Sequence, residues 1–293
     1  MPPSNPDAYR SVFRPGLFAG QTILVTGGGS GLGRCTAHEL HALGARIAMI
    51  GRTMSKLEEV AGELGDSATI VHAADLRDET QVKAAVGAVL DKAGRIDGLV
   101  NNAGGQFPAK LRDISLNGWN AVVNNNMTAT FLLSKEVYLR WMEANGGAIV
   151  NVGADWELGM PGMGHNGAAR AGQTNFTFTA SVEWAHSGVR VNSVIPGFIA
   201  SSGLDRYPES AHAVLRGVKR RVPLKRHGTE SEIAAAIVFL LSEAAAYVTG
   251  IAVRVDGGLH NNARSSFYEV PDHDRSKAYN GFPLYKVPKV LED

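Results

Sequence analysis

Short runs of apolar residues alternate with longer amphipathic stretches along most of the chain. The apolar runs are rich in β-branched residues and contain few charges, which is typical of strands that are covered on both faces of a parallel sheet. Seven such runs are predicted to be strands: Thr22–Thr26, Arg46–Ile50, Thr69–Ala73, Gly98–Asn101, Ala148–Val152, Arg190–Ile195 and Ile251–Val255.

The amphipathic stretches between these runs are predicted to be helices. Most are followed by a glycine, the residue that commonly ends a helix before the next strand. The predicted helices are Leu32–Leu43, Ser55–Leu64, Glu79–Ala93, Trp119–Ala144, Ala168–His186 and Ser231–Leu241. Because strands and helices alternate, right-handed crossovers are expected. The chain is therefore predicted to form a single-domain α/β fold, a doubly wound seven-stranded parallel sheet with helices on both faces.

The pattern divides the chain into one domain and two flanking segments. Residues 1–16 form a polar, proline-rich N-terminal arm, residues 17–258 form the domain, and residues 259–293 form an extended tail. Within the domain, the rhythm breaks over residues 198–223. Basic residues collect in this insert, namely Arg216, Lys219, Arg220 and Arg221. The insert either covers a substrate or presents a solvated helix face.

Charge and cysteine content narrow the classes of partner. The net charge is +1, from 29 basic and 28 acidic residues, so the chain offers no strong field to nucleic acid or to an anionic membrane. A small-molecule partner is expected, and no metal site is predicted. The single cysteine, Cys35, excludes an internal disulfide and favours a reducing compartment. With no apolar signal core or membrane span apparent, we expect a cytoplasmic protein.

A cluster of glycines, Thr26–Gly33, follows the first predicted strand and opens the first predicted helix. Glycines let the chain turn sharply and approach a pyrophosphate, while the helix N-terminus presents free N–H groups. Between a strand and a helix, this pattern predicts a dinucleotide-binding loop rather than an ordinary tight turn. The predicted contacts are Gly27, Gly29, Ser30, Gly31, Leu32 and Gly33.

The spacing of these glycines resembles the T-G-x-x-x-G-x-G of short-chain dehydrogenases/reductases. Further motifs of that family follow in order: Asp75, the N-N-A-G at Asn101–Gly104, Asn126, and Pro196-Gly197. The resemblance implies a Rossmann-type fold, a nicotinamide cofactor and a homotetramer or homodimer. The further cofactor contacts that it implies are Asp75, Leu76, Asn102, Ala103, Gly104, Pro196, Gly197 and Ile199.

Three longer strings are similar to peroxisomal trans-2-enoyl-CoA reductases and their bacterial relatives. They are NNAGGQF at Asn101–Phe107, GAARAG at Gly167–Gly172, and EVPDHD at Glu269–Asp274, which lies outside the cofactor-binding core. This resemblance implies fatty acid metabolism, with NADPH reducing the double bond of an enoyl-CoA. The peroxisomal location is not implied, because the chain ends in Leu291-Glu292-Asp293 rather than in a peroxisomal address.

The end of the second strand indicates which nicotinamide cofactor is used. NAD enzymes place a carboxylate there to accept the 2′-hydroxyl of the adenosine ribose. Here Gly51 stands in that place, and the next residue, Arg52, can pair with a 2′-phosphate. The sequence therefore predicts NADP(H), although Arg52 could also be an ordinary surface arginine.

The catalytic residues of the family are replaced in this chain. The family uses a serine and a tyrosine and lysine spaced Y-x-x-x-K, which move a proton at the substrate oxygen. The serine region reads Gly153-Ala154-Asp155, Asn166 aligns with the tyrosine, and Arg170 aligns with the lysine. A second register, used by enoyl reductase relatives, places Thr174 and Phe178 there. Neither register supplies a phenol or an amine.

The candidate catalytic residues are therefore Asn126, Asn166, Arg170, His165 and Asp155. Arg170 can bind the ribose but cannot relay a proton, and Asn166 can only donate a hydrogen bond. His165 is either a proton donor or a loop histidine without a role. Asp155 is either an acid of the site or a turn aspartate.

The missing groups bear unequally on possible reactions. Reduction of a ketone needs a proton at oxygen, whereas conjugate reduction of an enoyl thioester mainly needs stabilisation of an enolate oxygen. We therefore expect an NADPH-dependent reductase of an α,β-unsaturated acyl-CoA, including branched-chain or terpenoid ones. The first alternative is a non-catalytic NADP(H)-binding sensor or partner subunit. The second is a 3-hydroxyacyl-CoA dehydrogenase or another alcohol dehydrogenase.

Overall fold

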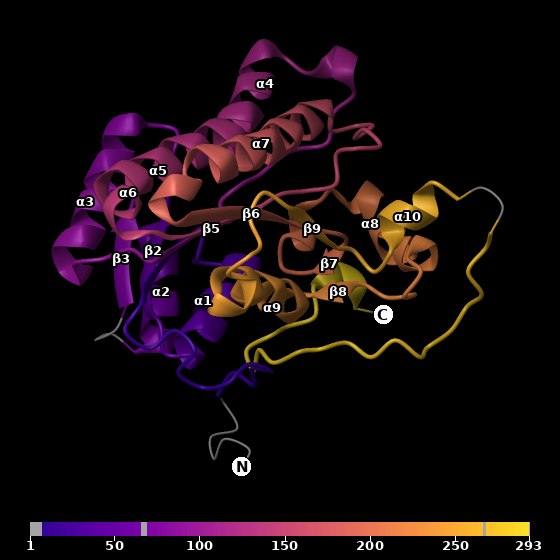
Figure 1. Cartoon of the computed structure of the whole chain (residues 1–293). Helices are drawn as coiled ribbons and strands as arrows, with labels where there is room; N and C mark the ends of the chain where they lie inside the picture. The colour runs from indigo at the N-terminus through magenta and orange to yellow at the C-terminus, as the bar shows by residue number, and fades with distance from the viewer. Residues whose placement is uncertain (1–7, 66–68, 266–267, 293) are drawn as a thin grey trace.

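The computed structural model describes residues 8–65, 69–265 and 268–292. Within these residues, seven parallel strands form the central sheet in the spatial order β3-β2-β1-β4-β5-β6-β9 (Figure 1). They are β1 (Thr22–Thr26), β2 (Arg46–Gly51), β3 (Thr69–Ala73), β4 (Gly98–Asn101), β5 (Gly147–Val152), β6 (Val189–Pro196) and β9 (Ala252–Val255). The predicted doubly wound sheet is confirmed. Its strand order reverses between β1 and β4, which opens a crevice at the carboxyl ends of the strands.

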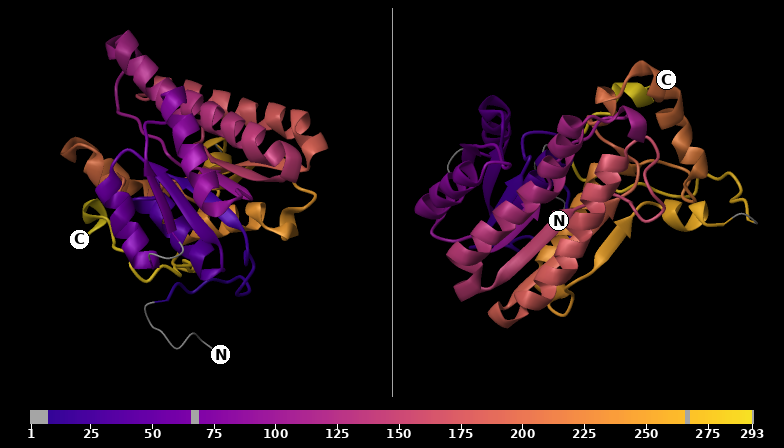
Figure 2. Two further views of the ribbon diagram at one scale, coloured as in Figure 1. Left: turned by 90° about the vertical axis from the view of Figure 1, so that its left-hand side faces the viewer. Right: turned by 90° about the horizontal axis from the view of Figure 1, so that it is seen from above.

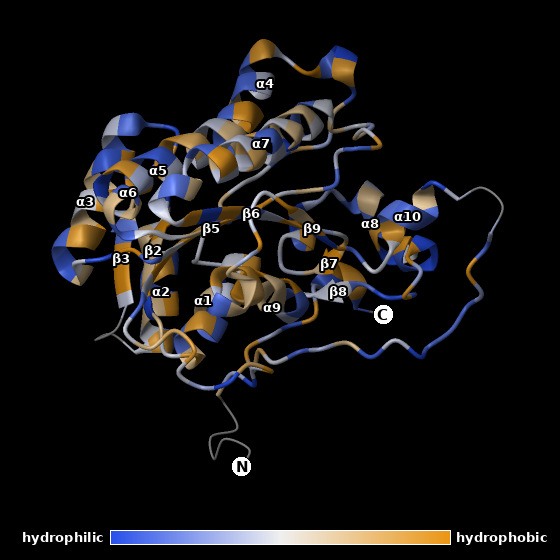
Figure 3. Ribbon diagram, viewed as in Figure 1, coloured by the Kyte–Doolittle hydropathy of each residue, from blue (hydrophilic) through white to orange (hydrophobic). Residues whose placement is uncertain are grey.

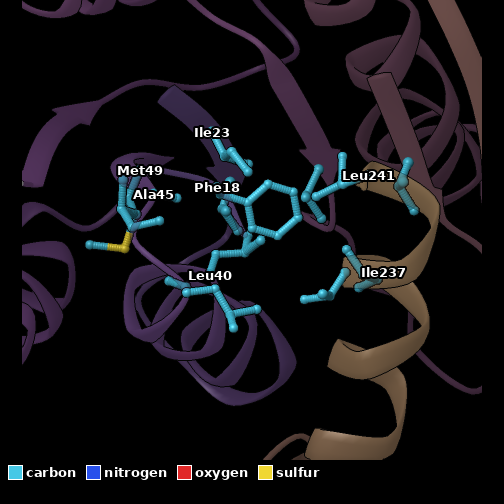
Figure 4. Close-up of a cluster of buried hydrophobic side chains, with 14 of the residues drawn as sticks. Phe18, Ile23, Leu40, Ala45, Met49, Ile237 and Leu241 are labelled. Carbon is cyan, nitrogen blue, oxygen red and sulfur yellow. The ribbon is translucent and has the colours of Figure 1, made fainter. Parts of the chain in front are cut away.

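Helices cover both faces of the sheet, and each face has its own core (Figures 1 and 3). One layer contains α1 (Gly31–Ala42), α2 (Met54–Leu64) and α9 (Glu230–Leu241), and the other contains α3 (Glu79–Ala93), α5 (Ala129–Val137) and α7 (Gly164–Glu183). Successive residues of β1 alternate between the two cores: Ile23 packs with Leu40 and Ile237 (Figure 4), whereas Leu24 packs on the opposite face. The period of two in a strand thus supplies both cores.

The long helix predicted over Trp119–Ala144 is interrupted in the structure. It consists of α4 (Leu116–Val123), a π-helical turn η2 (Asn124–Thr128), α5, a second π-helical turn η3 (Tyr138–Met142) and the short α6 (Glu143–Asn145). A π-turn inserts an extra residue and rotates the side chains that follow it. In η2 this turn buries the side chain of Asn126 completely, between the sheet and α7.

Helix α7 begins at Gly164, about one turn before its predicted start. Both His165 and Asn166 therefore lie in its first turn. The alternative that placed His165 in a loop is wrong, because the residue is helical. The helix lies beside α4 and α5 (Figures 1 and 2). In the described part of the chain, none of the helices is long and apolar enough to cross a membrane.

The insert and the tail are more structured than predicted. The insert contains β7 (Ile199–Ala200), the 3-10 turns η5 (Leu204–Arg206) and η6 (Val218–Arg221), and α8 (Glu209–Gly217), and β7 pairs with β8 (Gly228–Thr229). The tail was predicted to be extended throughout, which is wrong at both of its ends: it begins with α10 (Leu259–Ala263) and finishes with η8 (Lys289–Leu291).

The tail is held by contacts that the sequence pattern does not reveal. Its first helix is started by Asp256, whose carboxylate accepts hydrogen bonds from the backbone of Gly258 and His260 at 2.9 Å each. Further on, the tail returns to the N-terminal arm (Figure 2). There Phe282 stacks against Tyr9 at 6.1 Å between ring centroids. The two ends of the chain thus pack together beside α1.

Candidate active site

A cleft of about 520 Å³ lies at the carboxyl ends of β1, β2 and β4. Its walls come from the glycine loop, the end of β2, the N-N-A-G segment, η2 and the insert. The lining residues are Gly27, Gly29, Ser30, Gly31, Leu32, Gly51, Arg52, Thr53, Lys56, Leu57, Ala74, Asp75, Leu76, Asn102, Ala103, Gly104, Asn125, Ala129, Ser201, Ser202, Gly203 and Arg206. Most of the predicted cofactor contacts are therefore brought together in one cleft.

The glycine loop forms a cradle that other residues could not form. Gly27 and Gly31 have positive φ angles of 65° and 55°, in the left-handed region that favours glycine. A Cβ atom on Gly33 would stand 2.4 Å from the carbonyl oxygen of Gly27, so Gly33 serves helix packing rather than lining the cleft. At the start of α1, the Ser30 side chain caps no backbone N–H group. This arrangement fits the pyrophosphate of a dinucleotide.

The N-N-A-G segment is tied to the glycine loop by Thr26. The Thr26 hydroxyl oxygen accepts hydrogen bonds from the backbone N–H groups of Asn102 at 2.9 Å and Ala103 at 2.8 Å. The Asn102 side chain donates back to the Thr26 carbonyl at 2.9 Å. These bonds fix two walls of the cleft relative to each other.

The end of the cleft next to β2 carries several cations. Arg52 and Lys56 line it, and Arg206 of the insert lines the same cleft; Lys56 and Arg206 were missed because neither belongs to a family motif. The one acid in the lining, Asp75, accepts hydrogen bonds from Arg77, including one of 2.8 Å from Nε. Those bonds, with the nearby positive charge of Arg52, lower the pKa of Asp75 to about 2. The excess of cations fits a phosphate on the adenosine ribose.

At the other end of the cleft, Arg170 and Asn126 meet at Gly104. A Cβ atom on Gly104 would stand 2.6 Å from both Arg170 Nη2 and Asn126 Oδ1. Arg170 is 7% exposed and donates to the carbonyl of Val152 at 2.7 Å. Burial lowers the pKa of Arg170 to about 10, so the guanidinium is still a cation at neutral pH. A buried positive charge therefore stands beside the cleft.

Asn126 holds the backbone around this charge. Its Oδ1 accepts from the N–H of Gly105 at 3.1 Å, and its Nδ2 donates to the carbonyls of Gly105 and Val122 at 2.8 Å each. Its own carbonyl accepts from Gln173 of α7 at 3.3 Å. Since these bonds occupy the side chain, Asn126 positions the loop after β4.

Three residues of α7 have buried polar atoms without partners in the described part of the chain. The atoms are Nε2 of His165, Oδ1 of Asn166 and Nε of Arg170. The Nδ1 atom of His165 accepts from the backbone N–H of Asn166 at 2.9 Å, which leaves Nε2 as the ring nitrogen that can donate a hydrogen bond. Buried polar atoms are rarely unpaired, so this cluster, which is buried beside the cleft and does not line it, is a candidate for further pairing when a ligand binds.

Asp155, the other candidate acid besides His165, belongs to a different group of contacts. Its carboxylate pairs with His260 of α10 at 2.8 Å and with Arg254 of β9 at 4.0 Å. These contacts connect the loop after β5 to β9 and to the tail rather than to the α7 cluster. The predicted place of Asp155 among the acids of the site is not supported by these contacts. Nothing in the sequence pattern signalled its partners.

Two further residues shape this end of the site and were missed. Trp156 donates from its indole N–H to the hydroxyl of Thr174 at 3.0 Å, which anchors the loop before α7. Gln106 donates to the hydroxyl of Tyr207 at 3.0 Å, so the loop after β4 touches the insert. The insert therefore reaches the site, as the substrate-covering interpretation requires.

The segment after β6 is placed differently from the prediction. Neither Pro196 nor Gly197 lines the cleft, whereas Ser201, Ser202 and Gly203 do. Gly197 packs against Asp256, where a Cβ atom would stand 2.7 Å from the Asp256 Cα. Ile199 lines a second, more apolar hollow of about 570 Å³ under the insert.

Comparisons with known proteins agree with this geometry. A family model described as enoyl-(acyl carrier protein) reductase matches residues 27–260. A peroxisomal 2,4-dienoyl-CoA reductase of Danio rerio is 36% identical over 85% of this chain and 85% of its own length. A 3-oxoacyl-[acyl-carrier-protein] reductase of Synechocystis is also 36% identical, over 82% of this chain and 96% of its own. Among solved structures, the citronellol catabolism dehydrogenase of Pseudomonas aeruginosa PAO1 is 52% identical, with a TM-score of 0.77, 86% of this chain covered and 99% of that one.

Proposed function

The chain belongs to the short-chain dehydrogenase/reductase family of oxidoreductases, and we propose that it is an NADPH-dependent reductase of α,β-unsaturated acyl-CoA thioesters. The observation that carries this proposal is the α7 cluster. It provides a buried cation and an N–H donor in the region where the family places its tyrosine and lysine. Such a site can stabilise a developing oxyanion without moving a proton to it.

The cofactor would lie along the cleft, with its pyrophosphate on the glycine loop. The cations Arg52 and Lys56 at the β2 end support NADP(H) over NAD(H), because they can pair with a 2′-phosphate. Arg170, which reaches Gly104 at the other end, would hold the ribose next to the nicotinamide. When bound, the reduced nicotinamide supplies the hydride that the reaction needs.

The α7 cluster would bind the thioester carbonyl. As hydride reaches Cβ of the substrate, negative charge develops on that oxygen. The Nε2–H of His165 can donate a hydrogen bond to it, and Arg170 stabilises it electrostatically from its buried position. His165 can then relay a proton to Cα, taking one from solvent in exchange so that no imidazolate remains, or solvent can protonate that carbon directly.

The insert supports a CoA thioester as the substrate. Arg216, Lys219, Arg220 and Arg221 form a basic cluster, and in the described part of the chain none of them has an acidic partner, whereas Lys225 and Arg226 are paired. A compact group of unpaired cations suits the phosphates of CoA. The contact between Gln106 and Tyr207 connects this insert to the site.

The identity of the relatives supports a branched acyl chain. The structure that is 52% identical is named for the catabolism of citronellol, a branched terpenoid alcohol. The curated relatives named for dienoyl-CoA reduction share less of the sequence, at 36% and 34% identity. We therefore propose a terpenoid-derived, branched enoyl-CoA as the substrate.

The outer faces of α5 and α7 support assembly into a homo-oligomer. Large apolar side chains stand exposed there: Phe131 (43%), Phe178 (42%) and Val182 (77%). The two helices that carry these residues lie side by side (Figure 2). A second copy of the chain that covered these side chains would remove apolar area from water.

The test measures NADPH oxidation by the purified protein across linear and branched enoyl-CoA, dienoyl-CoA and 3-oxoacyl-CoA substrates. We expect turnover of branched enoyl-CoA and little turnover of the ketones. Thioesters of N-acetylcysteamine, which lack the CoA phosphates, should show a raised KM with a similar kcat, since they cannot reach the basic cluster. Binding of NADPH without turnover of any substrate would instead support the non-catalytic sensor.

A further inference from the structure

A buried carboxyl group lies beside the glycine loop. Glu230 is the first residue of α9 and is 5% exposed. Within the described residues, its side chain has no hydrogen-bond or ion-pair partner, although Glu232, two positions further along the same helix turn, is held by Arg226 at 2.6 Å. The Glu230 oxygens are not among the completely buried atoms without a partner, so they keep some contact with solvent, and water or a ligand can pair with them.

The carboxyl stands where the glycine loop meets the insert. Its Oε1 atom is 3.6 Å from the place that a Cβ atom on Gly31 would occupy, and the hydroxyl of Ser202 is 3.7 Å from the same place. Both Gly31 and Ser202 line the cofactor cleft. Gly31 also opens α1, whose N-terminal N–H groups would hold the pyrophosphate. The Glu230 carboxyl therefore lies directly behind Gly31, next to the phosphate section of the cleft, although Glu230 is not itself a lining residue.

The charge of this carboxyl changes near neutral pH. Burial raises the pKa of Glu230 to about 7, against the opposing influence of Arg34. Arg34 and Cys35 of α1 and Tyr285 of the tail are the charged or titratable groups that face it. Burial raises the pKa values of the Cys35 thiol and the Tyr285 phenol, so neither ionises in this range. Arg34 is held by Glu63 at 2.6 Å.

We propose that Glu230 binds the pyrophosphate of the cofactor as a neutral carboxylic acid, which donates its O–H to a phosphate oxygen, and that ionised Glu230 repels the cofactor. The chemistry requires this protonation state, because a carboxylate has no hydrogen to donate whereas the acid has one. The inference rests on the proposed cofactor site, but not on turnover.

A pH dependence of cofactor binding follows from this assignment. Bound phosphate keeps Glu230 protonated, so its pKa is higher in the complex than in the free protein. Affinity is then greatest below the pKa of the free protein and falls as the pH rises through it, by at most about tenfold for each pH unit. The cofactor's own 2′-phosphate acts in the opposite direction, because it gains charge with rising pH.

The experiment compares NADPH dissociation constants of the wild-type protein and Glu230→Gln, from about pH 6 to about pH 8.5, by fluorescence titration. Glutamine keeps a hydrogen-bond donor of the same size and cannot ionise. We expect similar affinities at the acidic end and a wild-type affinity about tenfold weaker than that of the variant at the alkaline end. Taking the ratio cancels the titration of the 2′-phosphate.

A matched control is Glu39→Gln. Glu39 is also completely buried, with a pKa raised by burial to about 7, but it binds Tyr9 and Ser11 of the N-terminal arm rather than facing the cleft. Its replacement should leave the pH profile of NADPH binding unchanged. Identical profiles for the wild-type protein and Glu230→Gln would overturn the proposal, whereas absence of NADPH binding at every pH would refute the proposed function itself.

A second measurement uses only the wild-type protein, so it tests the proposal even if Glu230→Gln does not fold. Calorimetric titration with NADPH near pH 8, in two buffers of different ionisation enthalpy, reports the protons taken up on binding. The proposal requires uptake approaching about one proton for each site, since Glu230 is mostly ionised in the free protein at that pH. No uptake would contradict it.

Discussion

The two ends of the cleft are formed by different parts of the chain, backbone at one end and side chains at the other. At the phosphate end, the chain contributes backbone: a loop with positive φ angles at Gly27 and Gly31, and the free N-terminus of α1. At the opposite end it contributes side chains: Arg170 of α7 lies beside Gly104, and Asn126 of η2 holds the adjacent loop. The first end depends on the backbone conformation of the glycine loop, and the second depends on which side chains α7 and η2 carry.

This difference explains why one end matches the family pattern and the other departs from it. A Cβ atom on Gly33 would stand 2.4 Å from a carbonyl oxygen, so substitution there disturbs the fold of the loop. On α7, by contrast, one polar side chain can replace another if its volume and hydrogen bonds are accommodated. Chemistry can therefore change on α7 while the cofactor cradle stays the same.

The strongest test of the comparison removes the buried charge. Arg170→Ala should abolish turnover and weaken NADPH binding, because it removes the hydrogen bonds to the Val152 carbonyl and to Oε1 of Gln173 and the cation beside Gly104. A hydrogen bond to a charged group contributes about 1.5–3 kcal/mol. Arg170→Lys should keep partial NADPH binding, since it retains the charge but changes the donor geometry. Cofactor titration and steady-state kinetics measure both effects.

A control for general destabilisation is Arg190→Ala. Arg190 is a partly buried arginine on β6, outside the cleft. It donates a hydrogen bond of 2.7 Å to the carbonyl of Leu240 on α9. That variant should melt at a lower temperature but bind NADPH with unchanged affinity. If it loses NADPH binding as Arg170→Ala does, the effect of Arg170 is structural and the comparison of the two ends fails.

A smaller effect is expected from the N–H donor, His165. His165→Ala should lower kcat by about a hundredfold, the lower range for loss of a positioned acid or base, without changing the affinity for NADPH. His165→Gln should recover part of the rate, because its amide retains an N–H donor. An unchanged kcat in His165→Ala would mean that solvent protonates the substrate, which would leave Arg170 as the main group at that end.

The smallest effect should come from the phosphate end. Arg52→Ala should weaken NADPH binding by about tenfold to a hundredfold, because a charge-assisted hydrogen bond contributes about 1.5–3 kcal/mol. Lys56 remains in the cleft and limits the loss. Binding of NADH, which lacks the 2′-phosphate, should hardly change and serves as the internal control. Equal weakening of both cofactors would show that Arg52 does not select the phosphate.

The sequence alone determined the sheet, its helices and the phosphate end of the cleft. Alternating strand and helix patterns are local, and the central strands lie within a residue or two of the predicted bounds. The glycine loop is also a local device, since the backbone conformation that it needs is encoded where it is used. Local rules therefore sufficed for these parts.

Only the tertiary structure decided what the side chains of the other end do. From the sequence, Asp155 is a candidate acid of the site. In the structure it contacts Arg254 of β9 and His260 of the tail, which are far along the chain. Glu230 carries no motif, and it gains its role when α9 packs against the glycine loop at Gly31. Burial, pairing and the position of the pKa depend on neighbours that are distant in sequence, so no local pattern can encode them.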